Sequence, residues 1–173
     1  PDLVTLVVTG GSLGALHLNE VLEQCLPLLL DVQVLHLTGR GKDGPIRAAA
    51  ASMPHYHVLD YLSAMESAYA VADLVLCRSG AGTVAELSAL GIPAFFVPLA
   101  IGNGEQELNA ADSIRAGGAE LVRDKDFDSQ VFSQRVMPLL TSPSRLAEMG
   151  RAARGVSPVD AAARLADLII SVG

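Results

Sequence analysis

The chain has 173 residues, half of them hydrophobic, with 19 acidic and 12 basic side chains and a formal net charge of −7 at pH 7. One well-filled core is the natural expectation for this length, which leaves no room for a second large domain. Because the negative charge repels a phosphate backbone, no nucleic-acid partner is expected.

Six short runs rich in β-branched residues or leucine predict strands in the part of the chain up to residue 122. They cover residues 3–8, 32–37, 57–59, 74–77, 94–97 and 120–122. Helix-length stretches lie between them, with apolar residues three or four positions apart, as in Leu18, Val21 and Leu22. Strands this apolar are buried on both faces, and right-handed crossovers then give a doubly wound parallel sheet covered by helices. The expected fold class is therefore α/β and Rossmann-like.

Three further helices are predicted after the last strand. They cover residues 128–140, 144–154 and 159–172. Pro143 and Pro158 stand where the second and third of these helices begin, a position that proline favours. We expect all three to pack on the sheet and to close a single domain over residues 1–173.

A glycine-rich turn follows the first predicted strand and opens the first helix, with the sequence GGSLGA at residues 10–15. Glycine lets the backbone approach a ligand at a helix N-terminus, where free N–H groups and the helix dipole favour an anion. The spacing is not G-x-G-x-x-G and no acidic residue ends the second strand, which argues against a dinucleotide. Phosphate binding and a purely structural tight turn stay equal alternatives for this loop.

A second loop of this kind runs from Cys77 to Glu86 and reads CRSGAGTVAE. In the usual strand order 3-2-1-4-5-6 the first and fourth strands are neighbours, so both loops would face one crevice at the switch point of the sheet. Thr83 and Glu86 have the T-x-x-E spacing of a capping box, in which Glu86 only satisfies backbone N–H groups. A carboxylate at this place can equally accept both hydroxyls of a ribose, so the two interpretations stay open.

Three motifs together resemble the MurG family of bacterial transferases, which add N-acetylglucosamine from UDP-GlcNAc to a lipid-linked muramoyl-pentapeptide. They are the loop at 10–15 with Asn19 a turn later, the segment 78–86, and the segment 104–110 with the sequence GEQELNA. The resemblance covers nearly the whole chain and implies one half of a GT-B fold, in which two Rossmann-like domains enclose a cleft. This chain would be the C-terminal, nucleotide-sugar-binding domain, without the N-terminal acceptor domain.

The resemblance also implies roles for individual residues. Glu86 would bind the ribose hydroxyls, and the backbone of Leu62 would face uracil. Glu105 and Gln106 would reach the GlcNAc hydroxyls, with Asn109 near the same end of the cleft. The diphosphate would be held by Ser12, Thr83 and the neighbouring amides, and the implied substrate-binding set also contains Gly11, Gly14, Asn19, Ser79, Gly80 and Ala81.

Some positions depart from the family pattern or have another expected role. Leu13 and Glu105 stand where glutamine is common in the family. Arg78 is expected to brace its loop against a carboxylate instead of pairing with a phosphate. The histidines are each expected to be packed or solvated and not catalytic: His17, His36, His55 and His57.

The implied reaction is an inverting displacement, in which an acceptor hydroxyl attacks the anomeric carbon and UDP leaves. Fixed N–H groups and helix dipoles would stabilise the charge on the departing diphosphate. No cofactor or metal is expected, because the sequence has no carboxylate cluster or histidine pair with ligand spacing. In the family the general base, the lipid-linked acceptor site and the membrane contacts belong to the N-terminal domain. No catalytic residue is therefore expected in this chain, which alone would be inactive.

Cysteine usage and the apolar runs bear on the compartment. Cys25 and Cys77 have no C-x-x-C spacing and are interpreted as buried core thiols. The apolar runs are too short to span a bilayer, and no charged-then-apolar leader opens the chain. A cytoplasmic protein is expected, and the resemblance implies a full enzyme held peripherally on the cytoplasmic face of the plasma membrane. The chain begins with Pro1 and not with an initiator methionine, and strand-like sequence starts at Leu3, which suggests a piece of a longer protein.

Two alternative functions stay open. One is a natural single-domain donor subunit of a two-subunit UDP-GlcNAc transferase, which would need a membrane partner. The other is a non-catalytic nucleotide-binding module whose glycine loops only build turns. A UDP-sugar epimerase shares the architecture, but more titratable residues would be expected in this half of such an enzyme.

Overall fold

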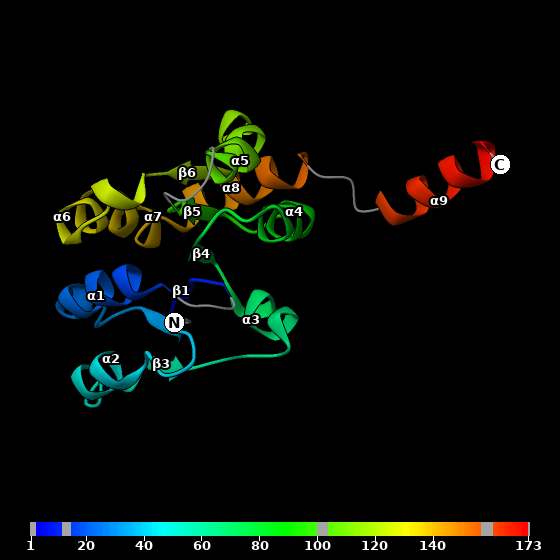
Figure 1. Cartoon of the computed structure of the whole chain (residues 1–173). Coiled ribbons are helices and arrows are strands. Elements are labelled where there is room, and N and C mark those ends of the chain that lie inside the picture. The colour runs from blue at the N-terminus through cyan, green and yellow to red at the C-terminus, as the bar shows by residue number, and fades with distance from the viewer. Residues whose placement is uncertain (1–2, 12–14, 100–103, 157–160, 173) are drawn as a thin grey trace.

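The computed structural model describes residues 3–11, 15–99, 104–156 and 161–172, and within them six strands form one parallel sheet (Figure 1). The strands are β1 Thr5–Thr9, β2 Gln33–Leu37, β3 Tyr56–Leu59, β4 Leu74–Cys77, β5 Ala94–Phe96 and β6 Ala119–Leu121. Their order in the sheet is β3-β2-β1-β4-β5-β6, and every neighbouring pair is parallel. The predicted doubly wound α/β fold is therefore confirmed, with β1 and β4 side by side at the switch point.

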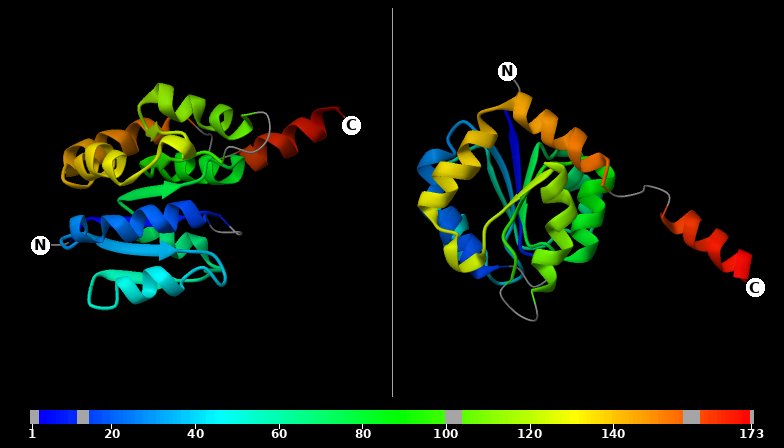
Figure 2. Two further views of the ribbon diagram at one scale, coloured as in Figure 1. Left: turned by 60° about the vertical axis from the view of Figure 1, so that its left-hand side comes forward. Right: turned by 90° about the horizontal axis from the view of Figure 1, so that it is seen from above.

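Helices cover both faces of this sheet, as the right-hand view of Figure 2 shows. Between the strands lie α1 Leu16–Cys25, the 3₁₀ turn Leu26–Leu28, α2 Gly44–Ala49, α3 Met65–Val71, α4 Ala81–Leu90 and α5 Glu105–Ala116. After β6 come the 3₁₀ turn Asp124–Asp126, α6 Ser129–Val131, a π-helical stretch Phe132–Val136, α7 Met137–Leu140, α8 Pro143–Arg154 and α9 Ala161–Val172.

The core has two halves because successive side chains of a strand point to opposite faces of the sheet. On β1, Leu6 and Val8 join the half covered by α1, α2 and the helices after β6. Val7, between them, joins the half covered by α3, α4 and α5. All five β1 residues are buried, which explains why the strand lacks polar alternation.

Both cysteines lie in this core, as predicted. Burial raises the pKa of the Cys25 thiol to about 12 and also raises the pKa of Cys77. Neither side chain is a thiolate at neutral pH, and the prediction that both are buried core thiols is confirmed.

The C-terminal helices behave differently from one another. Residues 129–140 and α8 pack on the sheet through buried side chains such as Phe132 and Leu146, as predicted. Helix α9 instead stands away from the sheet (Figures 1 and 2), with Leu168, Ile169 and Ile170 exposed. The prediction that this helix closes the domain is wrong, because an apolar helix face does not specify which surface will cover it. No helix in the described ranges is long and apolar enough to cross a membrane.

Candidate functional site

A cavity of about 470 Å³ opens at the carboxyl ends of the central strands. The glycine loops after β1 and β4 both contribute to it, through Gly10 and Gly11 on one side and Gly80 and Thr83 on the other. The two loops therefore share one crevice, as the strand order predicted. Further lining comes from the ends of β1, β2 and β4, from the segment 60–63, from α3, α4 and α5, and from the loop after β5. These residues include Leu37, Gly39, Tyr61, Leu62, Tyr69, Arg78, Glu86, Leu99 and Gln106.

The start of α4, at the edge of this crevice, has unused hydrogen-bonding groups. Gly80 is the N-cap residue, and no side chain caps the first N–H groups of the helix. Next to it, Ser79 is fully buried, and its hydroxyl has no partner in the part of the chain that the structure describes. Asn109 Nδ2 donates to the carbonyl oxygen of Ser79 at 3.1 Å and holds the turn in place. Such a helix start, with a buried free hydroxyl beside it, suits an anionic ligand.

The loop before α1, where it is described, also contains a glycine turn and leads to a helix without a side-chain cap. Gly11 adopts a φ of +79°, which favours glycine, and its N–H donates to Thr9 Oγ1 at 3.2 Å. Ala15 is the N-cap of α1 and provides no side-chain cap. Ser12, which the resemblance assigned to the diphosphate, and Gly14, another residue of the implied substrate-binding set, lie outside the described residues.

Arg78 braces the β4–α4 loop, as predicted. Its Nη1 donates to Val97 O at 2.9 Å and pairs with Asp124 Oδ1. Asp124 also accepts a hydrogen bond from His17 Nδ1 at 3.1 Å, so α1, β4 and the turn after β6 are joined at the crevice. Burial alone would raise the pKa of Asp124, but the hydrogen bonds from His17 and Arg78 outweigh it and lower the pKa. The carboxylate is therefore ionised at neutral pH and keeps the guanidinium in place.

Glu86 has a partner that the sequence did not reveal. The hydroxyl of Tyr69 on α3 donates to Glu86 Oε2 at 2.9 Å, and both residues line the cavity. Burial, and then the hydrogen bond to Glu86, raise the pKa of Tyr69, so its hydroxyl stays protonated. The capping-box interpretation is wrong, because α4 begins at Ala81 with Gly80 as its cap and Glu86 lies in the second turn.

Tyr69 is a residue of the site to which the sequence pattern assigned no role. A signal was present, because a buried tyrosine needs a hydrogen-bond partner for its hydroxyl, but the sequence does not say which residue provides it.

Two neighbouring loops, at residues 38–42 and 60–63, contribute a further part of the crevice wall. Leu62, which the resemblance assigned to uracil, lines the cavity together with Tyr61. The Arg40 guanidinium lies over the Tyr61 ring, 4.6 Å from its centroid. Gly39, with a φ of +89°, lines the wall between them and β2. This part of the crevice wall thus offers backbone groups and a flat aromatic side chain.

The residues predicted to contact the sugar lie at the start of α5. Gln106 lines the cavity, and its Oε1 accepts a hydrogen bond from Leu99 N at 2.9 Å. Glu105 is exposed in the first turn of α5 and does not line the cavity. Asn109 does not line the cavity, and its Nδ2 donates to Ser79 O next to the start of α4.

Asn19 occupies a different place from the other predicted residues. Its side chain is 6% exposed and lies behind the cavity wall, where it bonds to the carbonyl oxygens of Thr38 and Lys42. Ser79, which is fully buried, and Ala81, the first residue of α4, are also absent from the cavity lining. Gly11, Leu62, Gly80, Thr83, Glu86 and Gln106 are the predicted residues that the structure brings together around the cavity.

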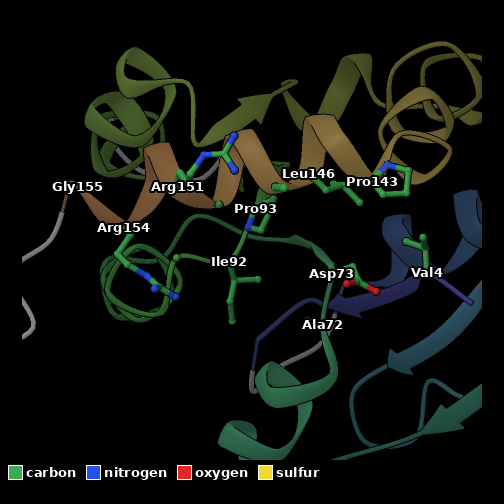
Figure 3. A pocket seen from close by; sticks show the side chains of 13 residues that line it. Val4, Ala72, Asp73, Ile92, Pro93, Pro143, Leu146, Arg151, Arg154 and Gly155 are labelled. Carbon is green, nitrogen blue, oxygen red and sulfur yellow. The ribbon is translucent and has the colours of Figure 1, made fainter. Parts of the chain in front are cut away.

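A second cavity, of about 640 Å³, lies at the amino ends of the strands, between α8 and the turns before β4 and β5 (Figure 3). Two of its charged residues are used by the fold: Asp73 Oδ2 accepts from Thr5 N, and Arg154 Nη2 donates to Leu90 O. Within the described ranges no group of three or more His, Cys, Asp or Glu side chains could hold a metal ion. The crevice at the carboxyl ends of the strands is therefore the stronger candidate site.

Comparison with known proteins gives a consistent result. The family model described as glycosyltransferase family 28 C-terminal domain matches residues 5–169. The UDP-N-acetylglucosamine–N-acetylmuramyl-(pentapeptide) pyrophosphoryl-undecaprenol N-acetylglucosamine transferase of Streptomyces coelicolor is 51% identical over 155 residues, 88% of this chain and 43% of that protein. The protein of the same name from Paenarthrobacter aurescens is 47% identical over 172 residues, 95% of this chain and 45% of that protein. The chain thus spans a little under half the length of these relatives.

Solved structures show the same likeness. MurG from Acinetobacter baumannii superposes with a TM-score of 0.90 at 32% identity, over 98% of this chain and 52% of that one. The calicheamicin glycosyltransferase CalG4 (TM-score 0.73, 21% identity, 99% of this chain and 43% of that one) shares the fold. So does a UDP-GlcNAc 2-epimerase from Neisseria meningitidis (TM-score 0.71, 13% identity, 98% and 44%).

Proposed function

Because this chain belongs to the glycosyltransferase family 28 C-terminal domain family, we propose that its crevice binds UDP-GlcNAc as the sugar donor of an N-acetylglucosaminyltransferase. The complete enzyme would be an inverting transferase that forms the lipid-linked disaccharide-pentapeptide precursor of peptidoglycan. The chain would be its C-terminal, donor-binding domain, and an N-terminal domain would bind the lipid-linked acceptor. The relatives named for this activity, at 51% and 47% identity, support the proposal.

The observation that carries the proposal is the Tyr69–Glu86 pair, in the crevice that the start of α4 shares with Gly10 and Gly11 of the loop before α1. Tyr69 holds one carboxylate oxygen of Glu86 at 2.9 Å, and Glu86 lines the cavity one turn beyond the glycines of α4. A carboxylate can accept both hydroxyls of a ribose, and the adjacent helix starts favour the phosphates attached to it. A carboxylate and a free helix start in one crevice are the groups that a nucleoside diphosphate needs.

The diphosphate would lie between the starts of α1 and α4. Gly80, Ala81 and Thr83 would provide backbone N–H groups or a hydroxyl, and the loop containing Gly11, Ser12 and Gly14 would do so from the other side. The buried Ser79 hydroxyl, which has no partner in the described part of the chain, would bond to the ligand or to a bridging water. Arg78, already engaged with Asp124, would keep this loop rigid.

The two ends of the donor would then occupy the two ends of the crevice. Uracil would meet the backbone of Leu62 beside Tyr61, and the GlcNAc hydroxyls would lie near Gln106 and Glu105. Asn109 would position Ser79 through their 3.1 Å hydrogen bond.

Transfer would follow an inverting displacement. The acceptor hydroxyl oxygen forms a bond to the anomeric carbon while the bond from that carbon to the β-phosphate oxygen breaks, and UDP leaves with the bonding electrons. The two helix starts would stabilise the negative charge that develops on the diphosphate. The acceptor proton would pass to a base that we assign to the N-terminal domain, together with the lipid contacts and peripheral attachment to the cytoplasmic face of the plasma membrane.

Calorimetric titration of the 173-residue chain with UDP, UDP-GlcNAc and UDP-glucose tests this proposal. UDP should bind, UDP-GlcNAc should be preferred to UDP-glucose, and Glu86→Gln should weaken each interaction about tenfold or more, because hydrogen bonds to a charged group are lost. Glu148→Gln, the same change at an exposed residue of α8, is the matched control. Equal binding by the wild type and the Glu86 variant, or absence of nucleotide binding, would contradict the proposal.

A further inference from the structure

A row of hydrogen-bonded, buried polar side chains lies behind the part of the crevice that Tyr61 and Leu62 line. Tyr56 OH lies 2.8 Å from His36 Nδ1, and His36 Nε2 lies 3.0 Å from Asn19 Oδ1. The three residues come from β3, β2 and α1, and their exposed fractions are 6%, 0% and 6%. Polar groups this deeply buried are costly unless every one is paired, so their arrangement must be well defined.

The hydrogen bonds of Asn19 determine which atom donates and which accepts in every other hydrogen bond of this row. Asn19 Nδ2 donates to Thr38 O at 3.1 Å and to Lys42 O at 3.4 Å, which leaves Oδ1 as the acceptor. His36 must then carry its proton on Nε2 and accept from the Tyr56 hydroxyl at Nδ1. Burial lowers the pKa of His36 to about 4, which keeps the ring neutral at neutral pH. The hydrogen bonds therefore run in one direction, from Tyr56 to His36, from His36 to Asn19, and from Asn19 to the two carbonyl oxygens.

The far end of this chain of bonds is the turn at residues 38–42. The single amide of Asn19 holds the first and last carbonyl groups of the turn. Thr38 also joins the turn to the end of β3, because its N–H donates to Leu59 O at 3.0 Å and its hydroxyl donates to the same oxygen at 3.2 Å. The segment 60–63, which lines the crevice, follows directly.

The middle of the turn forms part of the crevice wall. Gly39 lines the cavity, and Arg40 stacks on Tyr61, which also lines it. The turn contains two glycines with positive φ, Gly39 at +89° and Gly41 at +71°. Glycine has the largest conformational entropy to lose on ordering, so this stretch needs an external restraint to keep one shape. Asn19 supplies that restraint from behind the wall.

We propose that Tyr56, His36 and Asn19 form a positioning network that fixes the 38–42 turn as the base-side wall of the nucleotide crevice. Asn19 would thus control recognition of the uridine end of the donor without touching the ligand. The inference rests on the proposed donor-binding function and assigns to that site three positioning residues from outside its lining.

Binding and stability measurements on a set of variants of the 173-residue chain test this network. His36→Leu removes both hydrogen bonds, whereas His36→Gln keeps a donor for Asn19 and an acceptor for Tyr56. Asn19→Leu releases the turn itself. Ser88→Ala is the matched control, because it removes a buried hydrogen bond of 3.0 Å, to Ser113, that lies between α4 and α5. UDP and ADP are titrated into each variant, and each thermal transition is recorded.

The expected result is a loss of base recognition in the variants that break the network. His36→Leu and Asn19→Leu should bind UDP about fivefold to tenfold more weakly and lose most of the preference for UDP over ADP. His36→Gln should restore both properties, and Ser88→Ala should keep them even where its melting temperature falls. Amide exchange at Lys42 N–H, which donates to Gly39 O at 3.1 Å, should be faster in the two leucine variants without ligand.

Other outcomes separate the two proposals. If wild-type chain binds UDP and the leucine variants keep the same affinity and the same preference over ADP, the positioning role is refuted while the donor site stands. Unchanged exchange at Lys42 in folded leucine variants would refute it as well. If the wild type binds no nucleotide, the proposed function fails and the role assigned to the network fails with it.

Discussion

Removing one hydroxyl, by Tyr69→Phe, should weaken UDP binding without unfolding the chain. Tyr69 is 8% exposed, and phenylalanine fills the same space, so the core around α3 should remain packed. What is lost is the 2.9 Å hydrogen bond from the tyrosine hydroxyl to Glu86 Oε2. Without it the carboxylate can adopt other rotamers and is no longer held where the proposed function places the ribose.

The size of the effect follows from the exposure of Glu86. A hydrogen bond to a charged group contributes roughly 1.5–3 kcal/mol when both partners are buried. Glu86 is exposed, so water can replace the tyrosine hydroxyl and the loss should be nearer ~1 kcal/mol, or about fivefold in affinity. A change of this size is readily measured by calorimetry.

A double-mutant cycle identifies the cause. UDP and 2′-deoxy-UDP are titrated into wild type, Tyr69→Phe, Glu86→Gln and the double variant. We expect Tyr69→Phe to affect UDP more than the deoxy ligand, and to add less than about twofold once Glu86 is already glutamine. Full additivity of the two substitutions, or unchanged UDP binding in folded Tyr69→Phe, would refute the positioning of Glu86 by Tyr69.

Three further predictions concern stability. Burial lowers the pKa of His36 to about 4, so the unfolded chain binds the proton first as the pH falls below 6.5, and the free energy of unfolding should decrease by about 3 kcal/mol between pH 6.5 and 4. Urea unfolding at a series of pH values should show that the free energy of unfolding falls less steeply with pH in His36→Gln than in the wild type. Asp124→Asn leaves the Arg78 guanidinium without its ion pair and should cost ~1–3 kcal/mol, measured by thermal unfolding; no loss would mean that Arg78 does not brace the loop. Ser79→Ala removes a buried, unpaired hydroxyl, so it should leave the ligand-free chain equally stable or up to ~1 kcal/mol more stable while weakening UDP binding; a destabilised chain with normal affinity would contradict this.

The sheet and the place of the crevice could be predicted because both depend on local pattern. Apolar runs without alternation indicate strands buried on both faces, and six of them separated by helical periods give the doubly wound order. Glycines directly after β1 and β4 then lie at the same edge of the sheet. These features need only the residues within one segment and general rules of chain connection.

The errors arose where the answer depends on a partner from another segment. The T-x-x-E spacing of Thr83 and Glu86 is typical of a helix start, yet α4 begins earlier and Glu86 bonds to a tyrosine 17 positions before it. The apolar residues of α9 predict a covered helix face but name no surface to cover it.

Sequence by itself therefore determined the fold class, the strand order, the two loops of the crevice and the family resemblance, because all of these are written in short contiguous patterns. Tertiary structure alone decided which side chains act together. It joined Tyr69 to Glu86, Arg78 to Asp124 across 46 positions, and Asn19 to the carbonyl groups of a turn in the crevice wall. Such pairs form because packing brings separate elements within about 3 Å of each other, a distance that sequence separation does not encode.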